Sequence, residues 1–224
     1  MRLVEVYTST QGEGPNVGKP TQFVRFGGCN LRCPGWPCDT VFAIDPSQYR
    51  HTWEKLDPQE VFDRVADWPS NICLTGGEPL LQPTKEILEL IALAKDFGYT
   101  LEMFTNGTFE LPQNLDISYV MDWKLPGSGE DHLNATRIAN AKRLRKRDAI
   151  KFVVKDREDF KVACQLWRVH VPKSIMRSPT VYTGVVWGEL EEKQLVEWML
   201  EAKLPWRLNI QAHNFIWPAN ERAR

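Results

Sequence analysis

The sequence lacks a long hydrophobic run and has almost no net charge. Its apolar runs, such as Ile72 to Leu74, fall far short of the roughly 20 residues that a membrane span needs. The strand-like pattern that begins directly after Met1 predicts no signal peptide. With 28 basic and 29 acidic residues, the formal net charge of −1 offers no overall attraction to polyanions. We therefore expect no nucleic-acid partner and no membrane association.

Internal repeats, low-complexity tracts and shifts of composition are also missing, so nothing in the sequence marks a second domain. A chain of 224 residues that is 42% hydrophobic is long enough to bury one core and short for two. We predict a single domain that spans residues 1–224.

The five cysteines are a poor framework for disulfides because their number is odd and their spacing uneven. Cys29, Cys33 and Cys38 lie within ten residues of one another, whereas Cys73 and Cys164 stand alone. In a reducing compartment, a close trio of thiols more often binds a metal or a cluster than forms crosslinks. We therefore expect a cytoplasmic protein, and we interpret Cys73 and Cys164 as thiols of the core.

Hydrophobic periodicity predicts two opening strands, Leu3 to Thr8 and Thr21 to Phe26, joined by the Gly-rich loop Gln11 to Gly18. Six further strands are predicted at Asn71 to Thr75, Thr100 to Thr105, Tyr119 to Trp123, Ala149 to Val154, Thr180 to Thr183 and Arg207 to Gln211. Helices are predicted at Asp57 to Trp68, Thr84 to Phe97, Leu133 to Leu144, Arg157 to His170 and Leu190 to Ala202. This alternation is typical of an α/β fold with a parallel sheet and a site at the carboxyl ends of its strands. Because six strands are too few for an eight-stranded barrel, we predict a partial, six-stranded parallel β/α barrel.

The segment from Gly28 to Thr40 carries the strongest chemical signal, because it contains the cysteine trio. Three thiolates bind three irons of a four-iron cluster and leave the fourth iron open to an external ligand. The alternative is a zinc-binding module with a histidine as fourth ligand, although none of the four histidines has finger-type spacing to the cysteines. An open iron indicates chemistry at the cluster rather than electron storage.

The second signal is the segment Leu74 to Pro79, which ends a predicted buried strand. Gly76 and Gly77 allow the backbone to approach a ligand closely. The Glu78 carboxylate accepts hydrogen bonds, as an ammonium group of a zwitterionic cofactor would require. A Gly-Gly-Glu-Pro sequence also makes ordinary tight turns, so this motif is informative mainly in combination with the cysteines.

Together these two motifs resemble the radical S-adenosylmethionine superfamily, and further motifs narrow the resemblance to the family of 7-carboxy-7-deazaguanine synthases. The further motifs are Gln11 to Gly14, Phe23 to Phe26, Cys38 to Thr40, Thr105 to Thr108, Lys124 with Pro126, Ser128 and Gly129, Lys151 to Val153, and Gln211 with His213. The resemblance runs from about Glu5 to Trp217. It implies a partial barrel of the radical S-adenosylmethionine type. The implied reaction is that of a lyase, which converts 6-carboxy-5,6,7,8-tetrahydropterin to 7-carboxy-7-deazaguanine with loss of ammonia.

The resemblance also implies cofactors, partners and residue roles. The implied cofactors are a 4Fe-4S cluster on Cys29, Cys33 and Cys38, S-adenosylmethionine, and Mg²⁺ on Thr40. The implied cofactor-binding residues are Gly76, Gly77, Glu78 and Ser128, and the implied substrate-binding residues are Gln11, Gly12, Glu13, Arg25, Thr75 and His213. No catalytic residue beyond the cofactors is implied. The implied partners are the small pterin substrate, an electron donor such as flavodoxin, and a second copy of the chain in a homodimer.

Two features depart from the pattern of the family. Four residues, Pro34 to Pro37, separate the second and third cysteines, where the superfamily usually has two. Because its prolines restrict this loop and Gly35 permits a bend, we expect Cys38 to return to the cluster. Phe104 stands where relatives commonly have Glu, which predicts that a polar contact to the ligand is missing.

The nearest alternative function is the activase of a glycyl-radical enzyme, which shares the cluster and the Gly-Gly-Glu-Pro motif. The segment Gln11 to Gly14, Arg25 and His213 favours a small pterin-like substrate over a protein substrate.

Overall fold

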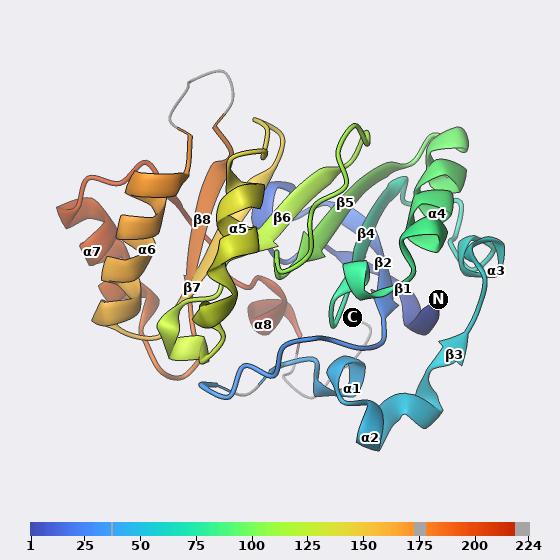
Figure 1. Cartoon of the computed structure of the whole chain (residues 1–224), viewed down its shortest axis with the longest axis horizontal. Coiled ribbons are helices and arrows are strands. Elements are labelled where there is room, and N and C mark those ends of the chain that lie inside the picture. Colours follow the sequence, from blue (N-terminus) through green and yellow to red (C-terminus); the bar gives the residue numbers. More distant parts are fainter. Residues whose placement is uncertain (37, 173–177, 218–224) are drawn as a thin grey trace.

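A nine-stranded sheet runs through the part of the chain that the computed structural model describes, residues 1–36, 38–172 and 178–217 (Figure 1). Its strands are β1 (Arg2–Thr10), β2 (Pro20–Phe26), β3 (Glu54–Lys55), β4 (Asn71–Gly76), β5 (Thr100–Thr105), β6 (Ser118–Asp122), β7 (Ala149–Val154), β8 (Thr180–Val185) and β9 (Arg207–Leu208). Their order is β3-β1-β2-β4-β5-β6-β7-β8-β9. Neighbours are parallel from β2 to β9, whereas β1 is antiparallel to both β2 and β3.

The six predicted parallel strands are all confirmed as β4 to β9, although β9 is shorter than predicted. The opening pair belongs to the same sheet, because β2 lies parallel to β4 with Gln22 opposite Ile72. The parallel part therefore has seven strands rather than six. The sheet stays open, with β3 and β9 at its two edges, so the partial barrel is confirmed and the predicted strand number was too small.

The helices are α1 (Val41–Ile44), α2 (Pro46–Tyr49), α3 (Pro58–Phe62), α4 (Thr84–Asp96), α5 (Asn134–Ala141), α6 (Arg157–His170), α7 (Glu192–Glu201) and α8 (His213–Ile216). Helices α4 to α7 lie over one face of the sheet (Figure 1). The four-residue helices α1, α2 and α8 were not predicted, because one turn is too short to show a helical period. Among the described residues, no helix has the length and apolar character to cross a bilayer.

Helix α3 begins as predicted and ends six residues early. The Asp57 side chain accepts from the Glu60 backbone N–H at 2.8 Å, and the Glu60 carboxylate accepts from the Asp57 N–H at 2.8 Å, which completes the capping box. The predicted end at Trp68 is wrong because the buried Gln22 side chain binds the backbone there. Gln22 Oε1 accepts from the Ala66 N–H at 2.6 Å, and its Nε2 donates to the carbonyls of Ala66 and Pro69.

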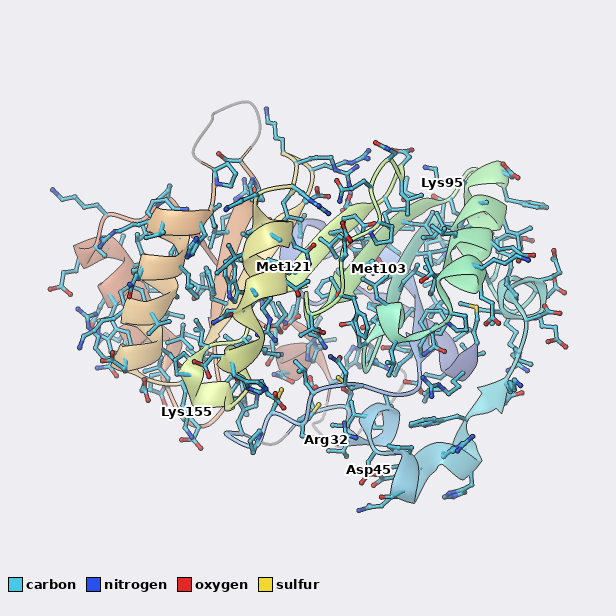
Figure 2. The ribbon with its side chains drawn as sticks, in the orientation of Figure 1. Arg32, Asp45, Lys95, Met103, Met121 and Lys155 are labelled. Carbon is cyan, nitrogen blue, oxygen red and sulfur yellow. The ribbon has the colours of Figure 1, made fainter. Side chains whose placement is uncertain are left out.

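The two faces of the sheet carry different clusters of side chains. Met103 and Met121, labelled in Figure 2, belong to the main core. Phe104 and Val120, their neighbours in the sequence, point to the other face and join a small second cluster with Ala149 and Tyr182. The loop between β1 and β2 lies on this second face, because a Cβ on its Gly14 would lie 3.4 Å from the Phe104 ring. The space between that loop and the sheet is where a ligand cavity forms.

We expect Gln22→Leu to lower the free energy of unfolding by about 2 kcal/mol, because the Ala66 N–H and the buried Pro69 carbonyl lose the Gln22 amide as their partner, whereas the Ala66 carbonyl keeps the Tyr99 hydroxyl. Urea denaturation followed by tryptophan fluorescence measures the change. The matched control is Gln59→Leu, since Gln59 is exposed and its side chain bonds to the exposed Asp63. We expect the control to stay within about 0.5 kcal/mol of the wild type. Equal effects of the two substitutions would contradict the role given to Gln22.

Candidate active site

A cavity of about 400 Å³ lies at the carboxyl ends of the parallel strands. All six predicted substrate-binding residues line it: Gln11, Gly12, Glu13, Arg25, Thr75 and His213. The three clustered cysteines, Thr40, Gly76 and Gly77 line it as well. Glu78 and Ser128 are fully buried and are not among its lining residues. The structure thus brings nearly all of the predicted site residues to one cavity.

The three cysteines line this cavity with free thiols. Cys29 Sγ accepts from the Leu31 N–H at 3.4 Å, and Cys38 Sγ lies 3.4 Å from Thr40 Oγ1. Burial raises the pKa of Cys29 above its usual value and that of Cys33 to about 11. Pro37, between Trp36 and Cys38, lies outside the described residues.

The three thiols are ligands of the kind that a four-iron cluster takes. Within residues 1–36, 38–172 and 178–217, no three His, Cys, Asp or Glu side chains converge as ligands of one metal ion. A four-iron cluster takes each of its thiolates on a different iron, and Cys29, Cys33 and Cys38 all line this cavity.

The Glu78 carboxylate lies behind the glycine turn and binds protein donors. Oε1 accepts from the Leu80 N–H at 3.0 Å and from Thr105 Oγ1 at 2.8 Å, and Oε2 accepts from the Asn106 N–H at 2.7 Å. Burial, which favours the neutral acid, outweighs these donors and raises the pKa of Glu78 to about 7. Glu78 therefore connects the turn after β4 to the loop after β5.

The glycine turn itself requires glycine for a physical reason. Gly76 has a φ of +135°, and a Cβ there would lie 2.1 Å from the Phe26 carbonyl oxygen. The turn consequently packs directly against the end of β2 and leaves its backbone on the cavity wall. Ser128, like Glu78, forms its hydrogen bonds within the protein. Its hydroxyl donates to the Leu125 carbonyl at 2.6 Å and accepts from the Glu130 N–H at 3.0 Å.

A row of alternating charges crosses the floor of the cavity. Lys151 Nζ lies 2.8 Å from Glu13 Oε2 and 3.3 Å from Asp122 Oδ2, and Lys124 Nζ lies 3.1 Å from the same Asp122 oxygen. Burial alone would raise the pKa of Glu13, but the charge and hydrogen bond of Lys151 and the bond from Gln211 Nε2 hold it below its usual value. Glu13 is therefore ionised at neutral pH. The other oxygen of the cavity-lining Asp122, Oδ1, is buried and has no hydrogen-bond partner among the described residues, which marks an acceptor for a ligand.

The Arg25 guanidinium is held from two sides on β2. Its Nε donates to Glu5 Oε1 at 2.8 Å and its Nη2 donates to the Tyr7 hydroxyl at 2.7 Å. Burial alone would lower the pKa of Arg25, but Tyr7 and Glu5 raise it, so the charge is retained. The Phe42 ring, 5.6 Å from the guanidinium carbon, packs against it within the cavity lining.

Sequence reasoning missed Glu102, which orients Gln11. Gln11 Nε2 donates to Glu102 Oε1, Asn16 Nδ2 donates to Glu102 Oε2 at 2.7 Å, and the Glu13 N–H donates to Gln11 Oε1 at 3.3 Å. These contacts fix which end of the Gln11 amide is donor and which is acceptor. The available signal was a single acid in the apolar strand segment Thr100–Thr105.

Phe104, the other departure from the family pattern, lines the cavity with an aromatic ring. Lys151 Nζ lies 6.0 Å from the centre of this ring, so the position contributes a cation–π contact rather than a carboxylate. The acidic group near Lys151 is supplied instead by Glu13 and Asp122.

Comparison with known proteins gives full-length relatives of one kind. The chain is 35% identical to a 7-carboxy-7-deazaguanine synthase of Clostridium acetobutylicum, over 99% of this chain and 98% of that protein. It is 34% identical to a 7-carboxy-7-deazaguanine synthase of Leptospira interrogans, over 95% of this chain and 94% of that protein. No family profile matches the chain.

Solved structures share the fold. The chain resembles QueE from Escherichia coli with a TM-score of 0.74 and 20% identity, over 95% of this chain and 94% of that one. It resembles SuiB of Streptococcus suis more distantly, with a TM-score of 0.51 and 11% identity, over 83% of this chain and 50% of that one.

We expect Glu78 to make stability depend on pH between about 4.5 and 7. An acid whose folded pKa is raised contributes stability below its unfolded pKa, and this contribution is lost as the pH rises through its folded pKa. For a rise from 4.5 to about 7, the loss is about 3 kcal/mol at pH 8. The amide side chain of the variant Glu78→Gln cannot titrate. The free energy of unfolding of this variant should therefore rise relative to that of the wild type as the pH increases from 5 to 8.

Urea unfolding of both proteins at four pH values measures this difference. Glu89→Gln is the control for loss of a charge, since Glu89 is exposed on α4. If the pH dependence of Glu78→Gln runs parallel to that of the wild type, the raised pKa is wrong.

Proposed function

The chain belongs to the 7-carboxy-7-deazaguanine synthase family, and from this premise we propose that it converts 6-carboxy-5,6,7,8-tetrahydropterin to 7-carboxy-7-deazaguanine with loss of ammonia, as a radical S-adenosylmethionine lyase. The observation that carries the proposal is a single cavity with three thiols on its wall and the groups Gln11, Glu13 and Arg25 beside them. A small molecule thereby reaches both the thiols and a set of charged groups. We propose that one domain contains the whole site.

Enzymes of this family use a 4Fe-4S cluster and S-adenosylmethionine. When bound, these groups supply the one-electron reduction and the hydrogen-atom abstraction that start the reaction. Cys29, Cys33 and Cys38 would hold the cluster. The backbone of Gly76 and Gly77 would border S-adenosylmethionine, with Glu78 fixing the turn from behind through its bond to the Asn106 N–H.

At the substrate end, the proposed roles follow from charge and hydrogen-bond capacity. The ionised Glu13 accepts from N–H groups, which suits the amino-pyrimidine edge of a pterin. Arg25 offers a retained positive charge to the substrate carboxylate. Gly12 makes room for His213, because a Cβ at residue 12 would lie 2.4 Å from His213 Nδ1. Thr75 lies opposite Arg25 in the β2–β4 pair, so both side chains serve the same region.

We also propose Mg²⁺ at Thr40. The Thr40 hydroxyl and Asp39 both line the cavity, and both are oxygen donors of the kind that Mg²⁺ takes. Few protein ligands are needed, because this ion keeps several waters and binds carboxylates of its substrate. The ion would then connect the end of the cysteine loop to the substrate.

The remaining proposals concern the setting of the enzyme. A trio of free thiols that must bind iron suits a reducing compartment, so we propose that the enzyme works in the cytoplasm. Reduction of the cluster requires an electron donor, for which we propose a flavodoxin. We further propose a homodimer.

Anaerobic incubation of the reconstituted enzyme with S-adenosylmethionine, carboxytetrahydropterin and a reductant tests the function, with mass spectrometry of the product. We expect Arg25→Ala to lower product formation about 30-fold or more, since the substrate carboxylate loses its buried partner. Arg25→Lys keeps the positive charge but lacks the planar guanidinium. Its activity should lie between that of the wild type and that of Arg25→Ala. Cluster content and cofactor affinity should stay unchanged in both variants.

The matched control for these variants is Arg64→Ala, because Arg64 is exposed and pairs with the exposed Glu54. It should keep wild-type turnover. Wild-type turnover by Arg25→Ala as well would refute the substrate contact. Cofactor cleavage by the wild type without deazaguanine product would refute the proposed substrate and favour the activase alternative.

A separate prediction concerns Mg²⁺. We expect activity to rise when Mg²⁺ is added to metal-depleted enzyme, and we expect Thr40→Val to lose this response because valine keeps the shape and removes the hydroxyl ligand. Initial rates over a Mg²⁺ titration measure both. Full turnover of the depleted wild type would show that Thr40 has another role.

A further inference from the structure

The widened cysteine loop packs against one turn of the chain, distant in sequence. This turn, which we call the seat, consists of residues 126–130, with the 3-10 helix Pro126–Ser128 at its start. Figure 1 shows the segment between β2 and α1 passing along one edge of the sheet toward the region between β6 and α5. Figure 2 shows Arg32 and Lys155 along that same edge.

The first contact is made by Glu130, whose carboxylate binds the backbone of the cysteine loop. Its Oε1 accepts from the N–H of Arg32 at 2.7 Å and from the N–H of Cys33 at 3.3 Å. Cys33 has a φ of +44°, a left-handed conformation that is costly for a residue with a side chain. A buried acceptor for its N–H stabilises the loop at the point where the backbone is strained.

The second contact is made by Gly35, in the middle of the four-residue spacer. Its N–H donates to the Ser128 carbonyl at 3.2 Å, and its own carbonyl accepts from Lys155 Nζ at 2.8 Å. A Cβ on Gly35 would lie 1.7 Å from the Gly127 oxygen, and a Cβ on Gly129 would lie 2.7 Å from Pro34. The two backbones therefore meet with no room for a side chain between them.

The seat is itself fixed to two helices. Asp159 on α6 accepts from the Gly127 N–H at 2.7 Å and from the Lys155 N–H at 3.1 Å. Arg137, fully buried on α5, donates from Nη1 to the Glu130 carbonyl at 2.8 Å and from Nε to the Asn106 carbonyl. The surface against which the cysteine loop packs is thus held in place by side chains of α5 and α6.

We propose that the seat, with Lys155, holds the widened cysteine loop in its cluster-binding conformation, and that Glu130 is the positioning residue that sets Cys33. The inference rests on the proposed function for the cluster and goes beyond it in naming what positions its ligands. Glu130 acts through the amides of Arg32 and Cys33, at a distance from any reacting atom. The seat explains how a spacer of four residues still leaves Cys33 and Cys38 lining the same cavity.

The test compares Glu130→Ala, Glu130→Gln and Lys155→Ala. The glutamine variant keeps an acceptor oxygen for both amides, so it should rescue what the alanine variant loses. Lys155→Ala removes the bond to Gly35 and leaves Glu130 in place. Its matched control is Lys161→Ala, because Lys161 lies on α6 and forms an exposed pair with Glu158.

Two readouts are independent of turnover. Hydrogen exchange of the peptide that contains Arg32 and Cys33, measured on protein without cluster, should be about tenfold faster in Glu130→Ala. Iron and sulfide per chain, with the electron paramagnetic resonance spectrum of the reduced cluster, should show cluster binding weakened about tenfold or more. Lys155→Ala should show a smaller effect in the same direction, and Glu130→Gln and Lys161→Ala should match the wild type.

Wild-type exchange and wild-type cluster content in Glu130→Ala would overturn the proposal. Equal losses in Glu130→Ala and Glu130→Gln would also overturn it, since the acceptor oxygen would then not matter. If Glu130→Ala fails to fold by circular dichroism, Lys155→Ala decides the matter, because wild-type exchange and wild-type cluster content in that variant would overturn the proposal. If the wild type binds its cluster and makes no deazaguanine, the proposed function fails while the exchange and iron measurements still decide on the seat.

Discussion

The structure of the site depends on one buried ammonium group, that of Lys151. It lies between Glu13 on the loop after β1 and Asp122 at the end of β6, and so connects the opening hairpin to the middle of the sheet. Removing one partner from such a buried pair costs about 3–5 kcal/mol, because the remaining charge is left without compensation. The loop over the second face of the sheet is therefore kept in place by charge, where the small apolar cluster of Val120, Ala149 and Tyr182 offers little area to pack on.

Around the cavity, buried carboxylates likewise connect segments that are far apart in the sequence. Glu78 joins the turn after β4 to the loop after β5, Glu102 joins β5 to the loop after β1, and Glu130 joins the turn after β6 to the cysteine loop. Each acid accepts from two or more donors. At least one of these donors belongs to a segment that is far away in the sequence. Such bonds leave the cavity walls preformed, which lowers the ordering that ligand binding requires. The polar groups of the site thus divide into those that face the cavity and those that hold them from behind.

Much of the fold was predictable because strands and helices of ordinary length carry a clear hydrophobic period. The strands β4 to β8 and helix α6 lie where the pattern places them. The end of α3 was not predictable, since it depends on Gln22, which comes from a strand far away in the sequence. The direction of the Glu78 side chain was not predictable for the same reason. Its motif is visible in the sequence, but its direction depends on donors from Thr105 and Asn106 that only the folded sheet brings near.

The spacing of the cysteines shows how far local sequence reasoning reaches. Two extra residues in a loop increase the conformational entropy that is lost when the cluster binds, because each added residue increases the number of conformations that binding must exclude. Here the extra length is matched by Gly35, whose missing side chain lets its backbone approach the Gly127 oxygen in the Pro126–Ser128 turn, and by Gly129, which leaves room for Pro34. Hydrogen bonds from both sides of Gly35 then replace the restriction that a shorter loop would have by its length alone. The geometry of a metal-binding loop is consequently set as much by the surface on which it rests as by the number of residues between its ligands.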